Sequence, residues 1–381
     1  MIEETNAFGK SRTYTYDADG NKISQTDRDG RITTYIYDAL NRETTENWLD
    51  SNGNSIYTLT NTYDANSELI AVSDPYSSYH YTYDANGRQT AVDNVGTPGA
   101  PRVLLTYNYD ANGNIISVTD KINGVTGATT NYSYDVLNQI TRITQTGNGV
   151  ENKRVDFIYD SLERLISLNR YSDLNGTQLL VGSSYIYDNL SRLQSLTHNN
   201  SSSTIAFYNF SHDAAGRITQ IQSIDGTNNY SYDVTDQLTG ASATNESYSY
   251  DANGNRTNTG YSTGTDNQLV SDGTYNYRYD GEGNLRERTE IATAKIRTFE
   301  WDYRNRLVAV IDQNSAGVIT QEVDYTYDAL NQRIAKSIAS SVTRFVYDRD
   351  NILVEFTATS SNSPSSLNKR YLYGLSTGQK L

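Results

Sequence analysis

The sequence predicts an all-β protein built from tandem β-hairpins, and three observations support this fold class. A short motif recurs along almost the whole chain of 381 residues. Tyr and Gly are abundant, at 33 and 26 residues, whereas there are only 4 Pro. Turn-forming dipeptides recur between the motifs. Self-similarity at a period of about 20 to 50 residues is typical of repeat proteins, in which each unit packs only against its neighbours.

The clearest copy of the motif begins at Tyr107. Residues two apart on a strand share a face, so Tyr107 and Tyr109 point to the same side. We expect Asp110 to accept hydrogen bonds from its own downstream backbone in an Asx turn. Gly113 then supplies the left-handed residue that closes a three-residue hairpin loop. A second strand, led by Ile115, runs back from this turn.

Fifteen such units are predicted, each marked by the Asp of the motif. The marker residues are Asp17, Asp38, Asp64, Asp84, Asp110, Asp135, Asp160, Asp188, Asp213, Asp233, Asp251, Asp280, Asp302, Asp328 and Asp348. The preceding residue is Tyr in thirteen units, with His212 and Trp301 as the substitutes. Steps of 18 to 29 residues between the Asp residues leave room for two short strands and two turns. We therefore expect roughly thirty strands.

The positions expected to be essential for the repeat combine its aromatic residues, its Asp and its Gly. They are Tyr16, Asp17, Gly20, Tyr83, Asp84, Gly87, Tyr107, Tyr109, Asp110, Gly113, Tyr250, Asp251, Gly254, Tyr279, Asp280, Gly283, Tyr327 and Asp328. Three residues after the Asp, eleven units have Gly or Asn, the two residues that best tolerate a positive φ. The Asn positions are Asn41, Asn138, Asn305, Asn331 and Asn351. Strained or remodelled turns are expected where Ser67, Glu163, Ser191 and Asp236 stand instead.

A second turn is expected midway between units. We call it the far turn and the Asp-led one the near turn. Two-residue hairpin signals mark far turns at Asn52-Gly53, Asn123-Gly124, Asn175-Gly176, Asp225-Gly226 and Asp272-Gly273. Length variation concentrates there, so specific binding is expected at the far turns. Helical periodicity is not sustained anywhere.

The organisation expected from this pattern is a single array over residues 1–381. Its first unit lies near residues 14–37 and its closing repeat near residues 370–381. Because a very large sheet must curl or cover its edges, we expect one long, curved, spiralling antiparallel sheet.

Charge and composition argue against several partners. The net charge is -14 and the basic residues are scattered, so nucleic acid is not an expected partner. Cys is absent, which excludes disulfides and thiolate metal sites. The first residues lack a basic and apolar leader pattern, and no apolar run approaches membrane-spanning length. Membrane insertion is therefore not expected.

Candidate chemistry is sparse. Residues 17–21 and 110–114 alternate oxygens as a calcium loop does, but the bidentate Glu at the twelfth position is missing, which favours a plain Asx turn. His80, His198 and His212 show no metal-ligand spacing, so packing roles are expected. Neither a paired general acid and base nor a Gly-Xaa-Ser-Xaa-Gly elbow is present. We predict no catalytic residue, no cofactor and no metal.

Residues 81–88, Tyr-Thr-Tyr-Asp-Ala-Asn-Gly-Arg, and residues 210–218 resemble the YD repeat of the RHS family. The resemblance covers nearly the whole chain. It implies a hollow shell, or part of one, as in bacterial Rhs and toxin-complex proteins and the related teneurin YD shell. In the toxins the shell encloses a carboxy-terminal toxic segment. Self-cleaving members carry Asp-Pro-Xaa-Gly, whereas the sole Asp-Pro here is Asp74-Pro75, so self-cleavage is not implied.

Two functions remain open from the sequence. The first is a non-enzymatic scaffold that encloses or shields a polypeptide, within a secreted or surface-exposed bacterial polymorphic toxin. The alternative is an extracellular adhesion or carbohydrate-binding repeat. Sugar-binding surfaces favour Trp, and only Trp48 and Trp301 are present. Most Tyr residues are therefore expected in cross-strand ladders, worth ~0.2 to 1 kcal/mol per pair. The expected partners are an enclosed or neighbouring polypeptide and, on the alternative, glycans.

Overall fold

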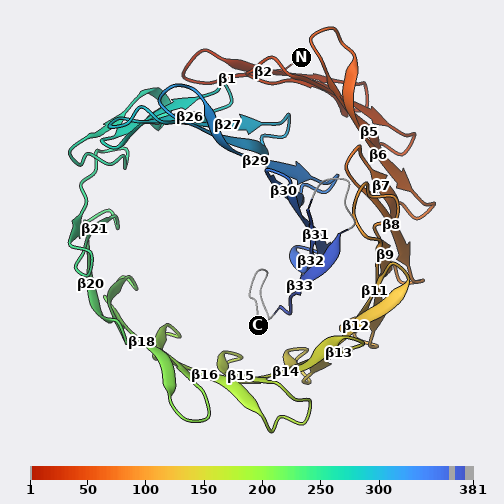
Figure 1. Ribbon diagram of the computed structural model, residues 1–381, viewed down its shortest axis with the longest axis vertical. Coiled ribbons are helices and arrows are strands. Elements are labelled where there is room, and N and C mark those ends of the chain that lie inside the picture. The colour runs from red at the N-terminus through yellow and green to blue at the C-terminus, as the bar shows by residue number, and fades with distance from the viewer. Residues whose placement is uncertain (1, 360–364, 374–381) are drawn as a thin grey trace. The chain divides into compact units, whose positions relative to one another are not determined.

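The computed structural model describes residues 2–359 and 365–373, and almost all of the regular secondary structure in this part of the chain is β (Figure 1). It contains 33 strands and one three-residue 3-10 turn, η1 (Thr265–Asn267). The all-β prediction is confirmed. No helix in the described ranges has the length and apolar character needed to cross a bilayer.

Strands β1 to β22 form the first sheet, of 22 strands. Their bounds are β1 (Ile2–Thr5), β2 (Ser11–Tyr16), β3 (Lys22–Thr26), β4 (Ile32–Tyr37), β5 (Glu43–Leu49), β6 (Ser55–Tyr63), β7 (Leu69–Ser73), β8 (Ser78–Tyr83), β9 (Gln89–Asp93), β10 (Val103–Tyr109), β11 (Ile115–Ile122), β12 (Val125–Tyr134), β13 (Ile140–Gly147), β14 (Val150–Tyr159), β15 (Leu165–Tyr171), β16 (Leu179–Tyr187), β17 (Leu193–Asn199), β18 (Thr204–His212), β19 (Ile218–Ser223), β20 (Gly226–Tyr232), β21 (Leu238–Ala241) and β22 (Glu246–Ser247).

The second sheet has 11 strands. Their bounds are β23 (Tyr261–Thr263), β24 (Leu269–Asp272), β25 (Tyr275–Tyr279), β26 (Leu285–Glu290), β27 (Ile296–Trp301), β28 (Leu307–Gln313), β29 (Ile319–Tyr327), β30 (Arg333–Ile338), β31 (Ser341–Asp348), β32 (Asn351–Ala358) and β33 (Ser366–Arg370).

The sequence predicted one continuous sheet, whereas the strand pairing gives two. Between β22 and β23 the only pairing in the described chain is an isolated bridge from Tyr250 to Arg256. Residues 252–260 are mostly Asn, Thr and Gly, and Asn and Gly are depleted in strands. The near turn at Asp251 therefore survives while the strands around it are too short to continue the ladder.

The chain divides into two compact units. Unit 1 comprises residues 1–105, 122–124 and 259–371, and unit 2 comprises residues 106–121, 125–258 and 372–381. Within each unit consecutive strands pair antiparallel, as β13 does with β14 and β26 with β27. That the repeats behave as one domain stays a prediction.

The core of unit 2 is an apolar ladder. Ile143 lies opposite Val155, and Phe157 lies opposite Leu168 on the next strand. Ile143 and Leu168 are completely buried, and Leu372 packs against the same cluster. Burial of each such side chain contributes about 1.5 to 3 kcal/mol. The motif aromatics pack here as the sequence predicted.

The core of unit 1 joins two segments that are distant in sequence. Trp48, Tyr57, Val72 and Tyr79, from β5 to β8, form one cluster with Ala329. Ala329 belongs to the near turn after β29, and Figure 1 shows β29 to β31 alongside β5 to β8. We call residues 259–371 the returning segment. The returning segment packs against residues 1–105, and this contact distinguishes unit 1 from unit 2.

Candidate functional site

The near turns have a uniform hydrogen-bonded geometry. In the unit at Asp110, one carboxylate oxygen accepts from the backbone N–H groups of Asn112 at 2.9 Å and Asn114 at 2.8 Å. The amide of Gly113 donates to the Asp110 carbonyl at 3.2 Å, and Gly113 has a φ of 88°. This is an Asx turn closed by a left-handed residue.

The other predicted repeat positions occupy equivalent places. A carboxylate oxygen of the predicted Asp accepts from the amide four residues later at Asp17, Asp84, Asp251, Asp280 and Asp328. Positive φ values are found at Gly20, Gly87, Gly254 and Gly283. Tyr16, Tyr83, Tyr109, Tyr279 and Tyr327 are the last residues of their strands, Tyr107 is buried within β10, and Tyr250 forms the isolated bridge.

Four substituted turns were expected to be strained or remodelled, and the remodelling did not occur. Ser67, Glu163, Ser191 and Asp236 have φ values of 67°, 62°, 62° and 67°. Their amides still donate to the marker Asp carbonyl, as in the standard turn. The Asp-led hydrogen bonds therefore hold these residues in a conformation that costs a non-Gly residue about 1 to 2 kcal/mol.

The near turn at Asp348 also differs from the expected geometry. Asn351 was expected to be the left-handed residue of this turn, but it is the first residue of β32 and pairs with Asp348. Arg349 has the positive φ instead, at 54°. The final near turn is thus a two-residue loop, one residue shorter than the others.

The far turns also differ from the two-residue loops expected. At Asn52-Gly53 the chain repeats the longer Asp-led turn, with the amides of Asn52 and Asn54 donating to Asp50 at 2.8 Å. Asn175-Gly176 lies in a longer loop between β15 and β16. The two-residue loop after β19 is residues 224–225, and the one after β24 is residues 273–274. Only residues 123–124 form the loop at the expected position.

In most units the Tyr before the marker Asp ties its unit to the preceding one. The Tyr159 hydroxyl donates at 2.9 Å to the carbonyl of Ile140, the first residue of the preceding return strand. Burial raises the pKa of Tyr159 to about 12, so the hydroxyl remains a donor. Equivalent bonds are made by Tyr37, Tyr63, Tyr83, Tyr134, Tyr187, Tyr232, Tyr250, Tyr279 and Tyr347.

Trp301 keeps this connection by different chemistry. Its indole N–H donates to the Leu285 carbonyl at 2.8 Å. The bond therefore requires an aromatic donor and not specifically a phenol. The sequence motif alone did not reveal this role of the Tyr hydroxyl.

In most units the residue four after the marker Asp ties its unit to the following one. Arg42 donates to its own Asp38 at 2.7 Å and to the carbonyl of Asp64 in the next unit at 2.9 Å. Its guanidinium also lies 4.8 Å from the ring centre of Tyr63. The hydrogen bond from Arg42 lowers the pKa of Asp38. Where this residue is Asn, as at Asn21, its amide reaches Asn41 of the next turn.

The returning segment docks through its near turns, and the first contact is a buried carboxylate. Glu282 is hydrogen-bonded and ion-paired to Arg12 and accepts from the Arg28 backbone N–H at 2.6 Å. Burial opposes ionisation of Glu282, but these two donors outweigh it and lower its pKa. The adjacent Gly281 amide donates to Asp29 at 2.8 Å. A Cβ on Gly281 would stand 2.8 Å from the Arg28 carbonyl, so this close approach requires glycine.

The next contact repeats the inter-unit pattern across the docking interface. Arg31 pairs with Asp27 and donates to the Asp302 carbonyl at 2.6 Å and to Asn305 at 3.0 Å. Asn284, from the preceding near turn, also donates to Asn305, at 2.9 Å. The turn at Asp302 is therefore hydrogen-bonded both to the preceding near turn of the returning segment and to residues 1–105.

The third contact is a largely buried ion pair between Arg304 and Glu46. Arg304 donates to both carboxylate oxygens of Glu46, at 3.1 and 2.6 Å. Trp48 donates its indole N–H to the same carboxylate at 2.6 Å. Tyr303 stacks on Trp48 with ring centres 5.1 Å apart and donates to the Leu49 carbonyl at 2.7 Å.

The fourth contact centres on Asp328, which has no exposed surface. The Tyr79 hydroxyl donates to its carboxylate at 2.9 Å. Burial raises the pKa of Asp328 to about 6, although the Gln332 amide and the Tyr79 hydroxyl act in the opposite direction. The Ala329 amide donates to the hydroxyl of Ser77, which is also fully buried. A marker Asp is here part of the docking interface.

Sequence reasoning missed the partners of this interface, although a signal existed. Most near turns place small, polar or aliphatic residues after the marker Asp, whereas Gly281-Glu282, Tyr303-Arg304 and Arg349-Asp350 depart from this pattern. The first two of these turns dock on residues 1–105. The turn at Asp328 docks as well, but its residues Ala329-Leu330 are ordinary for the repeat and carry no signal. Glu46 and Tyr79 carry no such signal, because both fit an ordinary strand.

The residues considered for metal or catalysis have structural surroundings. His198 makes a 2.8 Å hydrogen bond to Ser183, His80 is exposed on β8, and His212 ends β18. In the described ranges, no group of three or more His, Asp or Glu side chains is placed to hold a metal ion. The oxygens of the calcium-like loops already accept N–H groups, as at Asp17.

Both Trp residues line one aromatic cavity of about 360 Å³ in unit 1, together with Tyr76 and Tyr325. Trp48 is stacked on both faces, by Tyr57 at 3.9 Å and by Tyr303 at 5.1 Å. A sugar ring therefore has no free face of Trp48 to stack on, and this residue serves the docking interface.

Fold and site together define a tandem β-hairpin repeat protein whose units are linked by Tyr, Asp and Arg or Asn. The family model described as "Teneurin YD-shell" matches residues 173–375, more than half of the chain. The chain therefore belongs to the teneurin YD-shell family. The RHS repeat model matches residues 1–32, 16–47 and 109–151.

Individual relatives are distant and much longer. The tRNA nuclease WapA of Bacillus subtilis (strain 168) is 28% identical over 192 residues, which is 49% of this chain and 6% of that protein. The tRNA(Glu)-specific nuclease WapA of Bacillus subtilis subsp. natto (strain BEST195) is 29% identical over 148 residues, 39% of this chain and 4% of that protein.

Among solved structures, the Photorhabdus luminescens Tc holotoxin pore matches with a TM-score of 0.50 and 15% identity, over 95% of this chain and 23% of that one. A crystal structure of TcdB2-TccC3-TEV matches with a TM-score of 0.49 and 15% identity, over 93% and 23%. At these identities the likeness to the holotoxin concerns the fold alone.

Proposed function

We propose that this chain is a non-enzymatic scaffold whose YD-repeat strip encloses or shields a polypeptide, as part of a secreted or surface-exposed bacterial toxin. The observation that carries the proposal is the docking interface of unit 1. Buried bonds from Glu282, Arg304 and Asp328 tie the strip to an earlier part of itself. A repeat sheet that only extended in one direction would have no use for them.

The distribution of hydrogen bonds supports a structural role. Tyr, Asp and the residue four after Asp are all used to connect neighbouring units, as shown for Tyr159, Asp38 and Arg42. These side chains are therefore not available for acid–base chemistry. The WapA relatives are nucleases by name, but each match spans only 6% or less of their length. We therefore do not carry their nuclease activity over to this chain.

Protease protection tests the proposal. An unfolded, protease-sensitive polypeptide is joined after the last residue of the chain, and the same polypeptide is joined to an unrelated β-protein as control. Shielding by the scaffold predicts much slower digestion of the first fusion. Loosening the docking interface with Glu46→Ala should restore digestion. Equal digestion of both fusions would overturn the proposal.

The alternative function, carbohydrate binding, predicts a different result. Exposed aromatic residues such as Tyr76, half of whose surface is exposed, would be the contact residues. Glycan-array binding that disappears in Tyr76→Ala would favour this alternative. An array without signal, together with protease protection, would leave the scaffold as the function.

A further inference from the structure

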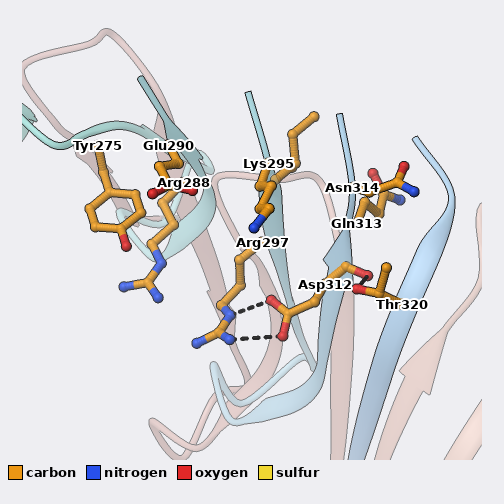
Figure 2. Close-up of a pocket in the computed structure, with 10 residues that line it drawn as sticks. Tyr275, Arg288, Glu290, Lys295, Arg297, Asp312, Gln313, Asn314 and Thr320 are labelled. Atoms are coloured by element: carbon orange, nitrogen blue, oxygen red, sulfur yellow. Dashed lines mark hydrogen bonds and ion pairs between the residues drawn. The ribbon is translucent and has the colours of Figure 1, made fainter. Parts of the chain in front are cut away.

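An open cavity of about 450 Å³ lies over strands β25 to β29, at their far-turn ends. Figure 2 shows Arg288, Lys295 and Arg297 lining it from neighbouring strands, with Tyr275 on one side and Asp312 on the other. Neither the repeat geometry nor the docking interface uses these side chains. The far-turn location is where the sequence predicted specific binding.

The cavity contains an unfavourable charge pair. Arg288 and Arg297 are direct cross-strand partners in the ladder of β26 and β27. Directly opposite side chains share a face, and like charges in this arrangement destabilise a sheet. The equivalent pair in unit 2, Ile143 opposite Val155, is apolar and buried. Folding alone therefore does not account for two arginines here.

Only one of the two guanidinium groups is neutralised. Arg297 donates to both carboxylate oxygens of Asp312, at 2.5 and 2.8 Å. Arg288 instead lies 4.6 Å from the ring centre of Tyr275, a cation–π contact. In the part of the chain that the structure describes, no salt bridge within 4.0 Å is formed by Arg288 or Lys295. Two cations of this cavity thus remain open to a ligand.

The chemistry of the cavity selects a carboxylate ligand. Three basic side chains face two acidic ones, Glu290 and Asp312, so the cavity is positive in a chain of net charge -14. Arginine binds carboxylates through paired, parallel hydrogen bonds. The Arg297–Asp312 pair already shows this geometry one strand away from Arg288.

The opposite side of the cavity suits a peptide backbone. The Gln313 amide, the NH2 group of Asn314 and the hydroxyl oxygen of Thr320 line it there. The Asn314 side-chain oxygen already accepts from the amides of residues 316 and 318, and the Thr320 hydroxyl donates to the Asp312 carbonyl. The volume exceeds the needs of a single carboxylate, and the cavity is open to solvent. An extended polypeptide presents alternate side chains to one face, about 7 Å apart.

We propose that this cavity binds an acidic stretch of polypeptide, with Arg288 and Lys295 holding its carboxylates. Arg297 is neutralised by Asp312, and the Tyr275 ring contacts the Arg288 guanidinium. The identity of this ligand as a shielded polypeptide rests on the proposed scaffold function. The cavity itself, with its unpaired cations, rests on the geometry above.

The test is calorimetric titration of the full chain with a blocked hexaglutamate peptide. Saturable binding is expected, and Arg288→Gln should weaken it about tenfold, since one charge-assisted hydrogen-bonding group is lost. The matched control is Arg278→Gln. Arg278 lies on the adjacent strand β25 with 78% of its side chain exposed, and it pairs with Glu287 on the opposite face. The Arg278→Gln change removes the same charge as Arg288→Gln and should leave peptide binding unchanged.

Three results would overturn this inference. They are equal weakening by Arg278→Gln, equal binding of a hexaglutamine peptide, and tighter binding of an oligothymidylate than of hexaglutamate. Thermal unfolding without peptide checks that Arg288→Gln is folded, and relief of the Arg288–Arg297 repulsion should raise its midpoint. Absence of hexaglutamate binding together with intact protease protection would reject this cavity while leaving the scaffold function standing.

Discussion

Units 1 and 2 use one repeat for two different purposes. In unit 2 the far turns at residues 148–149 and 224–225 are exposed, and the core around Ile143 is apolar. In unit 1 the near turns of the returning segment contact the first segment, and Glu46 and Asp328 are buried there. The comparison shows that the regular repeat residues build the sheet, while the interface uses both departures from the repeat, such as Glu282 and Arg304, and a regular residue, Asp328, that is buried there.

The largest effect separating the units is expected from Glu46→Ala. This change leaves Arg304 without its carboxylate and removes the acceptor of the Trp48 indole N–H. Breaking a buried pair from one side costs about 3 to 5 kcal/mol. Hydrogen-exchange mass spectrometry should show faster exchange in residues 43–59 and 300–306 and no change in unit 2.

The matched change in unit 2 is Arg142→Ala. Arg142 pairs with Asp156 at 2.7 Å, but 45% of its side chain is exposed. An exposed pair contributes about 1 kcal/mol or less. If both variants lost equal stability, burial would not be what distinguishes the two units.

The second effect is a pH dependence of unit 1. Burial raises the pKa of Asp328 from 3.8 to about 6, so the stability linked to this group is complete below pH 4 and is lost as the pH rises through 6. The loss amounts to about 3 kcal/mol. Denaturant unfolding at pH 5 and pH 7.5 should show a smaller loss of stability with rising pH in Asp328→Asn than in the wild type.

Asp110 in unit 2 is expected to change the folding stability with pH in the opposite direction. The hydrogen bond from Asn114 lowers its pKa, so its contribution is present at neutral pH and is lost as the pH falls through the lowered value. Asp110→Asn should therefore reduce the loss of stability in acid. The same pH trend in both variants would contradict the distinction between buried and turn-forming Asp residues.

The third effect concerns the turn residue itself. Gly113 has a φ of 88° and no atom within 4 Å of an added Cβ, so Gly113→Val introduces backbone strain alone. We expect a loss of about 1 to 3 kcal/mol, measured as a lower midpoint of thermal unfolding. Glu163→Gly, at a φ of 62°, should raise the midpoint. An unchanged midpoint in both variants would contradict the turn geometry.

The smallest effect is expected from Tyr159→Phe. The ring and its packing are kept, while the 2.9 Å bond to the Ile140 carbonyl is lost. A single hydrogen bond of this kind contributes about 0.5 to 1.5 kcal/mol. Exchange of the amides in residues 140–159 reports the loss, and Tyr76→Phe, at an exposed position of unit 1, should leave exchange unchanged.

The near turns were predictable because their cause is local. The Asp carboxylate and the left-handed residue lie within five residues of each other, and even Glu163 adopts the left-handed conformation. The loop at Arg349 was not predictable, because strand pairing of Asp348 with Asn351 decides its length. Glu46 and Arg304 are 258 positions apart, and no local pattern records such a contact.

The connections between units have a direction. The Tyr side chain reaches back to the preceding unit, and Arg or Asn reaches forward to the next, as with Tyr63 and Arg42. A complete unit that is duplicated or deleted therefore brings or removes one backward and one forward connection together. An insertion of part of a unit separates them. Gene duplication in whole units can thus change the length of the array without inventing a new junction.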